Sequence, residues 1–201
     1  MDFNAILKRA IAILTKPTEE WKVIKGETAT VQDLFLKYAI FLAAIPAIAG
    51  FIGFCIIGVS IGFGTIRIPV GNGLVWMILQ YVFSLAGVFL MGFIIDILAP
   101  SFGAKKDLVA SMKVAVYSYT AAWIAGVLYL IPSIAVLAAL LSLYTLVLLY
   151  FGMDQLKDAP KDKKMGYFAV SIVVAIVVFF LIGFIVRAVA FGSGASFVGG
   201  F

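Results

Sequence analysis

The chain has 201 residues, of which 64% are hydrophobic and 12% charged, and its formal net charge is +5. Soluble domains are roughly half apolar and a quarter charged, so this composition excludes an ordinary water-soluble fold and indicates an integral membrane protein. The absence of histidine and the single cysteine, Cys55, exclude an internal disulfide and a CxxC metal or redox site, and they remove the commonest general base.

Residues 1–33 carry the pattern of a segment that lies at a membrane surface. One face of a helix is apolar, and its residues are Phe3, Ile6, Leu7, Ala10, Ile11 and Leu14. Lys8 and Arg9 fall on the opposite face, so we predict an amphipathic interfacial helix on the cytoplasmic side. A cleaved signal peptide is the alternative, but charges interrupt the apolar stretch and no small-residue cleavage site follows it. After Pro17 we expect a polar linker in which Trp21 is an interfacial aromatic.

Five apolar runs follow, and they predict an all-α integral membrane protein with five transmembrane helices in one domain, residues 34–190. The approximate spans are residues 34–61, 74–98, 113–131, 133–151 and 167–186. As one helix, the run 113–153 would be about 60 Å long, twice the hydrocarbon thickness, so it must fold back at Pro132. Pro46 removes one backbone hydrogen bond from the first span and predicts a kink. The turn-rich residues 62–73 are predicted to form a loop.

The cations lie almost entirely on one side of these spans. The N-terminal side and the loops after spans two and four hold thirteen of them: Lys8, Arg9, Lys16, Lys22, Lys25, Lys37, Lys105, Lys106, Lys113, Lys157, Lys161, Lys163 and Lys164. Arg67 and Arg187 fall on the other side. By the positive-inside rule, the N-terminus is cytoplasmic and the glycine-rich tail, residues 191–201, lies outside an inner or cytoplasmic cell membrane.

Asp96 is a carboxylate at the cytoplasmic end of the second span, about one turn before Pro100. The negative end of the helix dipole and the adjoining hydrocarbon both disfavour a carboxylate here unless a cation or hydrogen-bond donor approaches it. Lys105, Lys106 and Lys113 are the expected partners. Two interpretations stay open: an ion pair that fixes the turn between spans two and three, or a polar recognition point at the cytoplasmic face.

Four consecutive polar residues, Tyr117, Ser118, Tyr119 and Thr120, enter the membrane near the start of span three. Hydroxyl side chains commonly bond to neighbouring helices in lipid, which would make this segment a structural contact. The alternative is a lined polar cavity, in which Tyr117 and Asp96 would meet in one pocket.

No catalytic, cofactor or metal site is expected from the sequence. One membrane-embedded carboxylate is too few for an aspartyl dyad, and a serine hydrolase would lack its base. The cations are not gathered on a polar domain with interleaved aromatics, so nucleic acid is not an expected partner. The basic loop Lys157–Lys164 either follows from topology alone or binds anionic lipid headgroups.

These motifs resemble those of the YIP-domain (Ypt/Rab-interacting) multi-pass membrane proteins, in particular the short prokaryotic-type members. Asp96–Pro100 is similar to the family's Asp-Leu-Tyr-Gly-Pro motif, with Leu and Ala in place of its Tyr and Gly. Tyr117–Thr120 resembles its Tyr-Gly-Tyr-Ser-type motif, and Pro17, Trp21 and Ile24 resemble its pre-span pattern. The resemblance implies five spans, a cytoplasmic N-terminus and a protein that organises or recruits partners, with eukaryotic relatives in vesicle trafficking and membrane shaping. It implies no established reaction.

We therefore expect a non-enzymatic membrane scaffold. Its expected partners are the lipid bilayer, anionic lipids, and a membrane or cytoplasmic protein at the surface around Asp96–Lys106, and a homo-oligomer is compatible with the sequence. A small permease or channel with a polar pocket near Asp96 and Tyr117 is the alternative, because broken helices and embedded polar groups mark transport paths.

Overall fold

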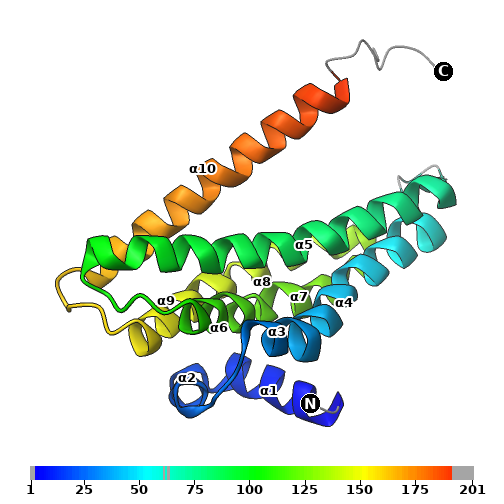
Figure 1. Ribbon diagram of the computed structural model, residues 1–201. Coiled ribbons are helices and arrows are strands. Elements are labelled where there is room, and N and C mark those ends of the chain that lie inside the picture. The colour runs from blue at the N-terminus through cyan, green and yellow to red at the C-terminus, as the bar shows by residue number, and fades with distance from the viewer. Residues whose placement is uncertain (1–2, 61, 63, 192–201) are drawn as a thin grey trace.

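Five helical stretches are long and apolar enough to cross a membrane, which confirms the predicted all-α class (Figure 1). The computed structural model describes residues 3–60, 62 and 64–191, with side chains as far as Leu181. The five stretches are Val31–Ile57, Val70–Phe102, Leu108–Leu130, Pro132–Leu156 and Lys164–Leu181. They are taken below as spans one to five.

Two short helices precede the first span and lie beneath the bundle in Figure 1. Helix α1 is Phe3–Thr15 and α2 is Pro17–Gly26. The prediction of a polar linker after Pro17 is wrong, because these residues form helix α2. Proline at the first helical position and the acidic side chains of Glu19 and Glu20 in the first turn favour the start of a helix. We call residues 3–26 the N-terminal hairpin.

Span one is built from four successive helical segments. They are α3 (Val31–Leu34), the π-helical η1 (Phe35–Ala39), α4 (Ile40–Phe51) and the π-helical η2 (Ile52–Ile57). Thr30 caps α3 and forms a capping box with Asp33. Pro46 lies inside α4, where the neighbouring chain at Gly126 leaves no room for a β-carbon. The two π-helical segments flank this proline, so the irregular backbone extends beyond the predicted kink.

A small hairpin joins spans one and two at the end of the bundle away from the N-terminal hairpin. Strand β1 (Val59–Ser60) pairs antiparallel with β2 (Thr65–Ile66). Gly58 precedes β1 with φ of +87°, a conformation that favours glycine. Part of the predicted loop is therefore strand, and the following helix begins earlier than expected.

Spans two and three form a helical hairpin. Helix α5 (Val70–Leu98) continues into the 3₁₀ turn η3 (Ala99–Phe102). Asp107 then caps α6 (Leu108–Ser118), accepting a hydrogen bond from the Ala110 amide at 3.0 Å. Span three continues as α7 (Thr120–Ala125) and the 3₁₀ segment η4 (Gly126–Leu130).

Spans three and four fold back on one another at Ile131 and Pro132, as the length of the apolar run requires. Ile131 has extended backbone angles, and Pro132 opens the 3₁₀ turn η5 (Pro132–Ile134). Helices α8 (Ala135–Ser142) and α9 (Tyr144–Leu156) complete span four.

The last helix, α10 (Lys164–Phe191), begins against α5, η3 and α9 and then diverges from the bundle (Figure 1). Many of the apolar side chains between Lys164 and Leu181 are exposed, which is expected of a helix surface that faces lipid. Residues 192–201, nearly all of the predicted tail, lie outside the described residues.

Candidate functional site

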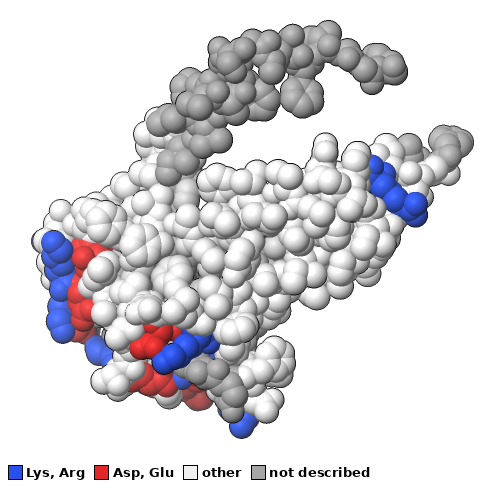
Figure 2. All heavy atoms as spheres, turned by 45° about the vertical axis from the view of Figure 1, so that its right-hand side comes forward, with Lys and Arg blue, Asp and Glu red and all other residues white. Residues whose placement is uncertain are grey.

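Charged side chains gather at one end of the bundle (Figure 2). We call it the charged end, and it comprises the N-terminal hairpin, the turn after span two and the loop after span four. The ion pairs among the described residues are Arg9–Glu20, Arg9–Glu27, Lys25–Asp158, Lys37–Asp33, Lys105–Asp107, Lys157–Asp96 and Lys164–Asp154. Each of these pairs joins residues in or beside these elements, so the charged end is also where the candidate site residues lie.

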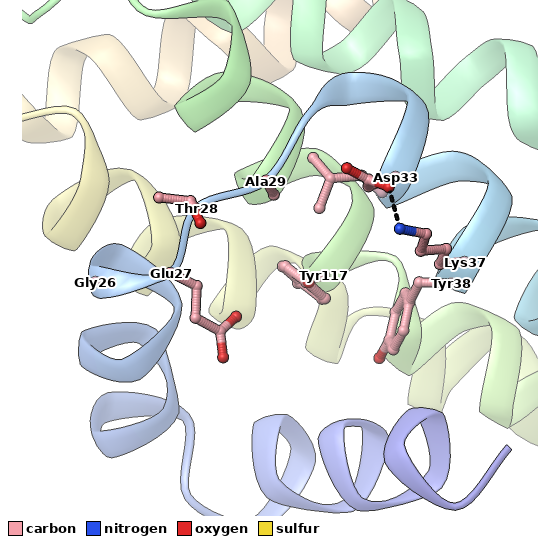
Figure 3. Close-up of a pocket in the computed structure, with 9 residues that line it drawn as sticks. Gly26, Glu27, Thr28, Ala29, Asp33, Lys37, Tyr38 and Tyr117 are labelled. Carbon is pink, nitrogen blue, oxygen red and sulfur yellow. Dashed lines mark ion pairs between the residues drawn. The ribbon is translucent and has the colours of Figure 1, made fainter. Parts of the chain in front are cut away.

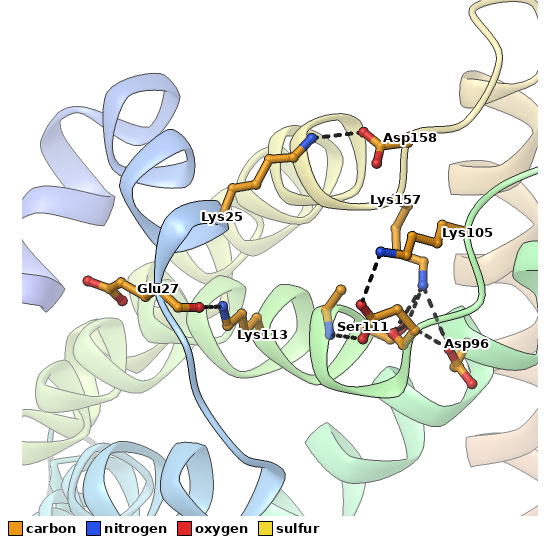
Figure 4. A network of polar contacts seen from close by, with 10 residues as sticks. Lys25, Glu27, Asp96, Lys105, Ser111, Lys113, Lys157 and Asp158 are labelled. Atoms are coloured by element: carbon orange, nitrogen blue, oxygen red, sulfur yellow. Dashed lines mark hydrogen bonds and ion pairs between the residues drawn. The ribbon is translucent and has the colours of Figure 1, made fainter.

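Asp96 pairs with a lysine that the sequence did not single out for it. Lys157, directly after α9, places its Nζ 3.7 Å from Asp96 Oδ1. The Ser111 hydroxyl lies 3.3 Å from the same oxygen and accepts a hydrogen bond of 2.7 Å from Lys157 Nζ (Figure 4). Asp96 is 6% exposed, Lys157 and Ser111 not at all, so the network ties spans two, three and four together inside the protein.

The predicted partners of Asp96 are wrong, because their side chains are used elsewhere. Lys105 lies on the exterior, 3.9 Å from the Asp107 carboxylate, and Lys106 is exposed. Lys113 is buried, and its Nζ donates hydrogen bonds to the carbonyls of Ile24 and Glu27. Lys113 therefore supplies a donor to the carbonyls at the C-terminal end of α2, where the Ile24 carbonyl also accepts a hydrogen bond of 3.3 Å from the amide of Glu27, the C-cap residue.

Lys157 is an unusual cation because it lies in the protein interior. Burial lowers its pKa, while the carboxylates of Asp96 and Asp107 act in the opposite direction. The sequence placed Lys157 in a basic loop, but hydropathy cannot show that this lysine turns inward while Lys161 and Lys163 stay exposed.

Tyr117 and Thr120 both act as contacts between helices. The Tyr117 ring packs edge-on against the Tyr38 ring, with centroids 4.9 Å apart, and against the Trp21 ring at 6.3 Å. Thr120 Oγ1 and the Tyr38 hydroxyl form a buried hydrogen bond of 2.9 Å. Thr120 thus makes a hydroxyl contact between helices, whereas Tyr117 contacts its neighbours through its ring.

Ser118 and Tyr119 have weaker roles. Ser118 is buried, and its hydroxyl has no hydrogen-bond partner within the described part of the chain. Tyr119 is half-buried, with its ring 6.2 Å from that of Trp123. Pro100, also singled out from the sequence, is exposed in η3.

The N-terminal hairpin is held against the bundle by residues whose contacts could not be predicted from the sequence. Arg9 forms ion pairs with Glu20 and Glu27, and its guanidinium carbon lies 5.6 Å from the centre of the Tyr117 ring. Burial alone would lower the pKa of Arg9, but the Glu27 and Glu20 carboxylates raise it overall, so the side chain stays charged. Its positive charge therefore joins α1 to α2 and to span three.

Trp21 is fully buried and is not the interfacial aromatic that the sequence predicted. It fits against Gly152 on α9, where an added β-carbon would lie 2.7 Å from the indole ring. A bulky aromatic in the hairpin and a glycine in the fourth span are the only signals in the sequence for this contact, and 131 positions separate them.

A cavity of about 510 Å³ opens between the N-terminal hairpin and the start of span one (Figure 3). Its wall includes Glu27, Asp33, Leu34, Lys37, Tyr38 and Tyr117. Asp96 is not part of this wall, so this cavity is not the shared pocket of Asp96 and Tyr117 that the alternative interpretation describes. The two residues belong to different polar clusters because Asp96 turns toward Ser111 and Lys157 instead.

A second, more polar cavity of about 410 Å³ shares Glu27, Thr28 and Ala29 with the first. Lys25, Lys105, Asp107, Lys113 and Asp158 contribute to its wall. Two of the predicted site residues, Lys105 and Lys113, therefore meet here, at an opening that carries both signs of charge. Within the described residues there is no group of three or more side chains suited to hold a metal ion.

Comparison with known proteins places these features in a family. A Yip1 domain matches residues 11–184. The inner membrane protein YohC of Escherichia coli K12 and that of Escherichia coli O6:H1 are each 29% identical to this chain over 170 residues, which cover 83% of this chain and 87% of the relative. No solved structure matches it. Because the match extends from the N-terminal hairpin into the fifth span, the protein belongs to the Yip1-domain family of membrane proteins.

Proposed function

We propose that the protein is a non-enzymatic membrane scaffold whose charged end faces the cytoplasm and contacts anionic lipid headgroups and a partner protein. The imbalance of charges at that end carries the proposal. Seven carboxylates there are engaged in ion pairs, whereas six exposed lysines form none within the described chain: Lys8, Lys16, Lys22, Lys106, Lys161 and Lys163.

The acidic residues that form no ion pair among the described residues are Glu19 and Asp162. The exposed surface of the charged end is therefore positive, although the residues beneath it are nearly balanced. Lysines near a membrane surface attract anionic lipids, by about 1 kcal/mol per lysine. The inner-membrane relatives support the assignment to a cell membrane, and the lysine distribution supports the cytoplasmic orientation.

A titration of anionic phospholipid tests the lipid part of the proposal. Phosphatidylglycerol is added to the protein in neutral detergent micelles, and the unfolding temperature is followed. We expect stabilisation of the wild-type protein that weakens with added salt, because screening shortens the range of surface charge. Replacing Lys106, Lys161 and Lys163 by glutamine should reduce the effect, whereas the matched triple arginine variant should keep it. Equal stabilisation of both variants would contradict the proposal.

Crosslinking in native membranes tests the protein part. A photoactivatable side chain at position 106 should capture a discrete partner, and the same label at Ile78 on the lipid-exposed side of α5 serves as the control. Recovery of lipid and self-contacts alone from position 106 would reject the partner.

A small permease is the second candidate, because the cavity beside Tyr117 has enough volume for a small molecule. Liposomes that contain the purified protein distinguish the two functions. The scaffold predicts no solute or ion flux, whereas flux that Tyr117→Phe abolishes would support the permease and overturn the scaffold.

A further inference from the structure

The cavity between the N-terminal hairpin and span one has spare hydrogen-bonding capacity. Glu27 pairs with Arg9 through Oε1, and its other carboxylate oxygen has no partner among the described residues. Tyr117 is 2% exposed, and its hydroxyl has no hydrogen bond within the same part of the chain. Lys37 Nζ pairs with one carboxylate, that of Asp33, and an ammonium group has three donors. An acceptor and two donors thus border one cavity (Figure 3).

The charges around this cavity balance one another. The charged residues in the wall itself are Glu27, Asp33 and Lys37. Behind the wall, Arg9 pairs with Glu27 and Glu20, and the Lys113 ammonium group is bonded to the Glu27 carbonyl, so that three carboxylates stand against three cations. A ligand with a net charge would leave this balance uncompensated in a partly buried site. A zwitterion would bring a positive group to the carboxylates and a negative group to the donors.

The position of the cavity indicates where such a ligand comes from. Leu34, at the beginning of span one, forms part of the wall, and the next turns of that span expose Leu36 and Phe41, each about half accessible. In a membrane-spanning helix these apolar side chains face lipid, so the cavity borders the headgroup region of the same leaflet.

We propose that this cavity binds the headgroup of a phospholipid with a primary ammonium and a phosphate diester, as in phosphatidylethanolamine. The free Glu27 oxygen accepts a hydrogen bond from the ammonium group, and Lys37 and the Tyr117 hydroxyl donate to the phosphate. A quaternary choline headgroup carries no N–H donor and cannot make the bond to Glu27. The acyl chains lie along the exposed apolar side of span one.

Native mass spectrometry of the protein, released from nanodiscs with equal phosphatidylethanolamine, phosphatidylcholine and phosphatidylglycerol, tests the proposal. We expect the ethanolamine lipid to be retained in preference to the choline lipid. Glu27→Gln and Tyr117→Phe should each weaken its retention, about tenfold for the loss of one hydrogen bond to a charged group. Glu19→Gln and Tyr119→Phe make the same chemical changes outside the cavity and should have no effect.

The possible results distinguish the proposed lipid from other occupants of the cavity. Equal retention of ethanolamine and choline lipids, or equal effects of cavity and control variants, would overturn the proposal. Glycerophosphoethanolamine, the water-soluble headgroup, is added as a competitor, and if it displaces the lipid at equal concentration the occupant is a soluble molecule instead. Should Glu27→Gln fail to fold because its pair with Arg9 is weakened, Lys37→Gln tests the same cavity through its phosphate side. The six exposed lysines are unchanged in all variants, so failure here is distinguishable from failure of the proposed scaffold surface.

Discussion

Substitution of Lys157 by methionine is the sharpest test of the network that joins three spans. Methionine fills a similar volume but removes the cation 3.7 Å from the Asp96 carboxylate, and both side chains are buried. At that separation the attraction between unit charges is roughly 4 kcal/mol for an effective dielectric constant of 20. Because the single change leaves a carboxylate buried without its cation, we expect a loss of about 3–5 kcal/mol in the free energy of unfolding.

Asp96→Leu combined with Lys157→Met should recover most of this loss, because replacing both partners of a buried pair by apolar side chains is often nearly neutral. The Ser111 hydroxyl still has a partner in the double variant, since it lies 2.9 Å from the Asp107 carbonyl. Unfolding in neutral micelles titrated with a denaturing detergent, followed by tryptophan fluorescence, measures the free energies of the wild type, Lys157→Met, Asp96→Leu and the double variant. The reasoning would be refuted if Lys157→Met unfolded with a free energy within about 1 kcal/mol of the wild type. It would also be refuted if the double variant lost as much stability as the two single variants together.

Three further predictions concern packing, pH and a buried hydrogen bond. Gly152→Ala should lower the free energy of unfolding by about 1–3 kcal/mol, because the added β-carbon would displace the buried Trp21 ring. Gly166→Ala is the control, since its β-carbon would lie 3.5 Å from the nearest side chain, and equal unfolding free energies for the two variants would contradict the prediction. The lowered pKa of Lys157 means that the unfolded chain binds more protons than the folded one, so the free energy of unfolding should rise as pH increases toward 10.5. Lys157→Met should reduce this dependence of stability on pH in thermal melts, and an unchanged dependence would contradict the prediction. Tyr38→Phe should cost about 1–3 kcal/mol by orphaning a buried hydroxyl on span three, and an unchanged unfolding midpoint would count against that bond.

The five spans could be predicted because lipid imposes a simple requirement of length and apolarity. Pro132 marked the fold-back between spans three and four for the same reason, since a proline cannot continue the hydrogen-bonded ladder. The face of the first helix could be predicted only in part. Ile6 and Ala10 of the predicted apolar face are buried, but Phe3, Leu7 and Ile11 are exposed, and Ile13, which was not assigned to that face, is buried.

The partners of the polar residues could not be predicted from the same pattern. Asp96 and Lys157 are 61 positions apart, and their contact depends on how α5, α6 and α9 pack, which hydropathy does not encode. Trp21 was assigned to the interface because aromatic residues are common there, yet the space above Gly152 accommodates its ring inside the protein. Residue types thus identified which side chains need a partner, while tertiary packing determined which partner they found.

The most direct test of the account is the side of the membrane on which the charged end lies. In a Cys55→Ser background, single cysteines are placed at position 106, in the turn after span two, and at position 67, between the first two spans. Intact cells are treated with a membrane-impermeant maleimide. The account predicts that position 67 is labelled from outside and position 106 only after the membrane is opened. Labelling of position 106 in intact cells would contradict it.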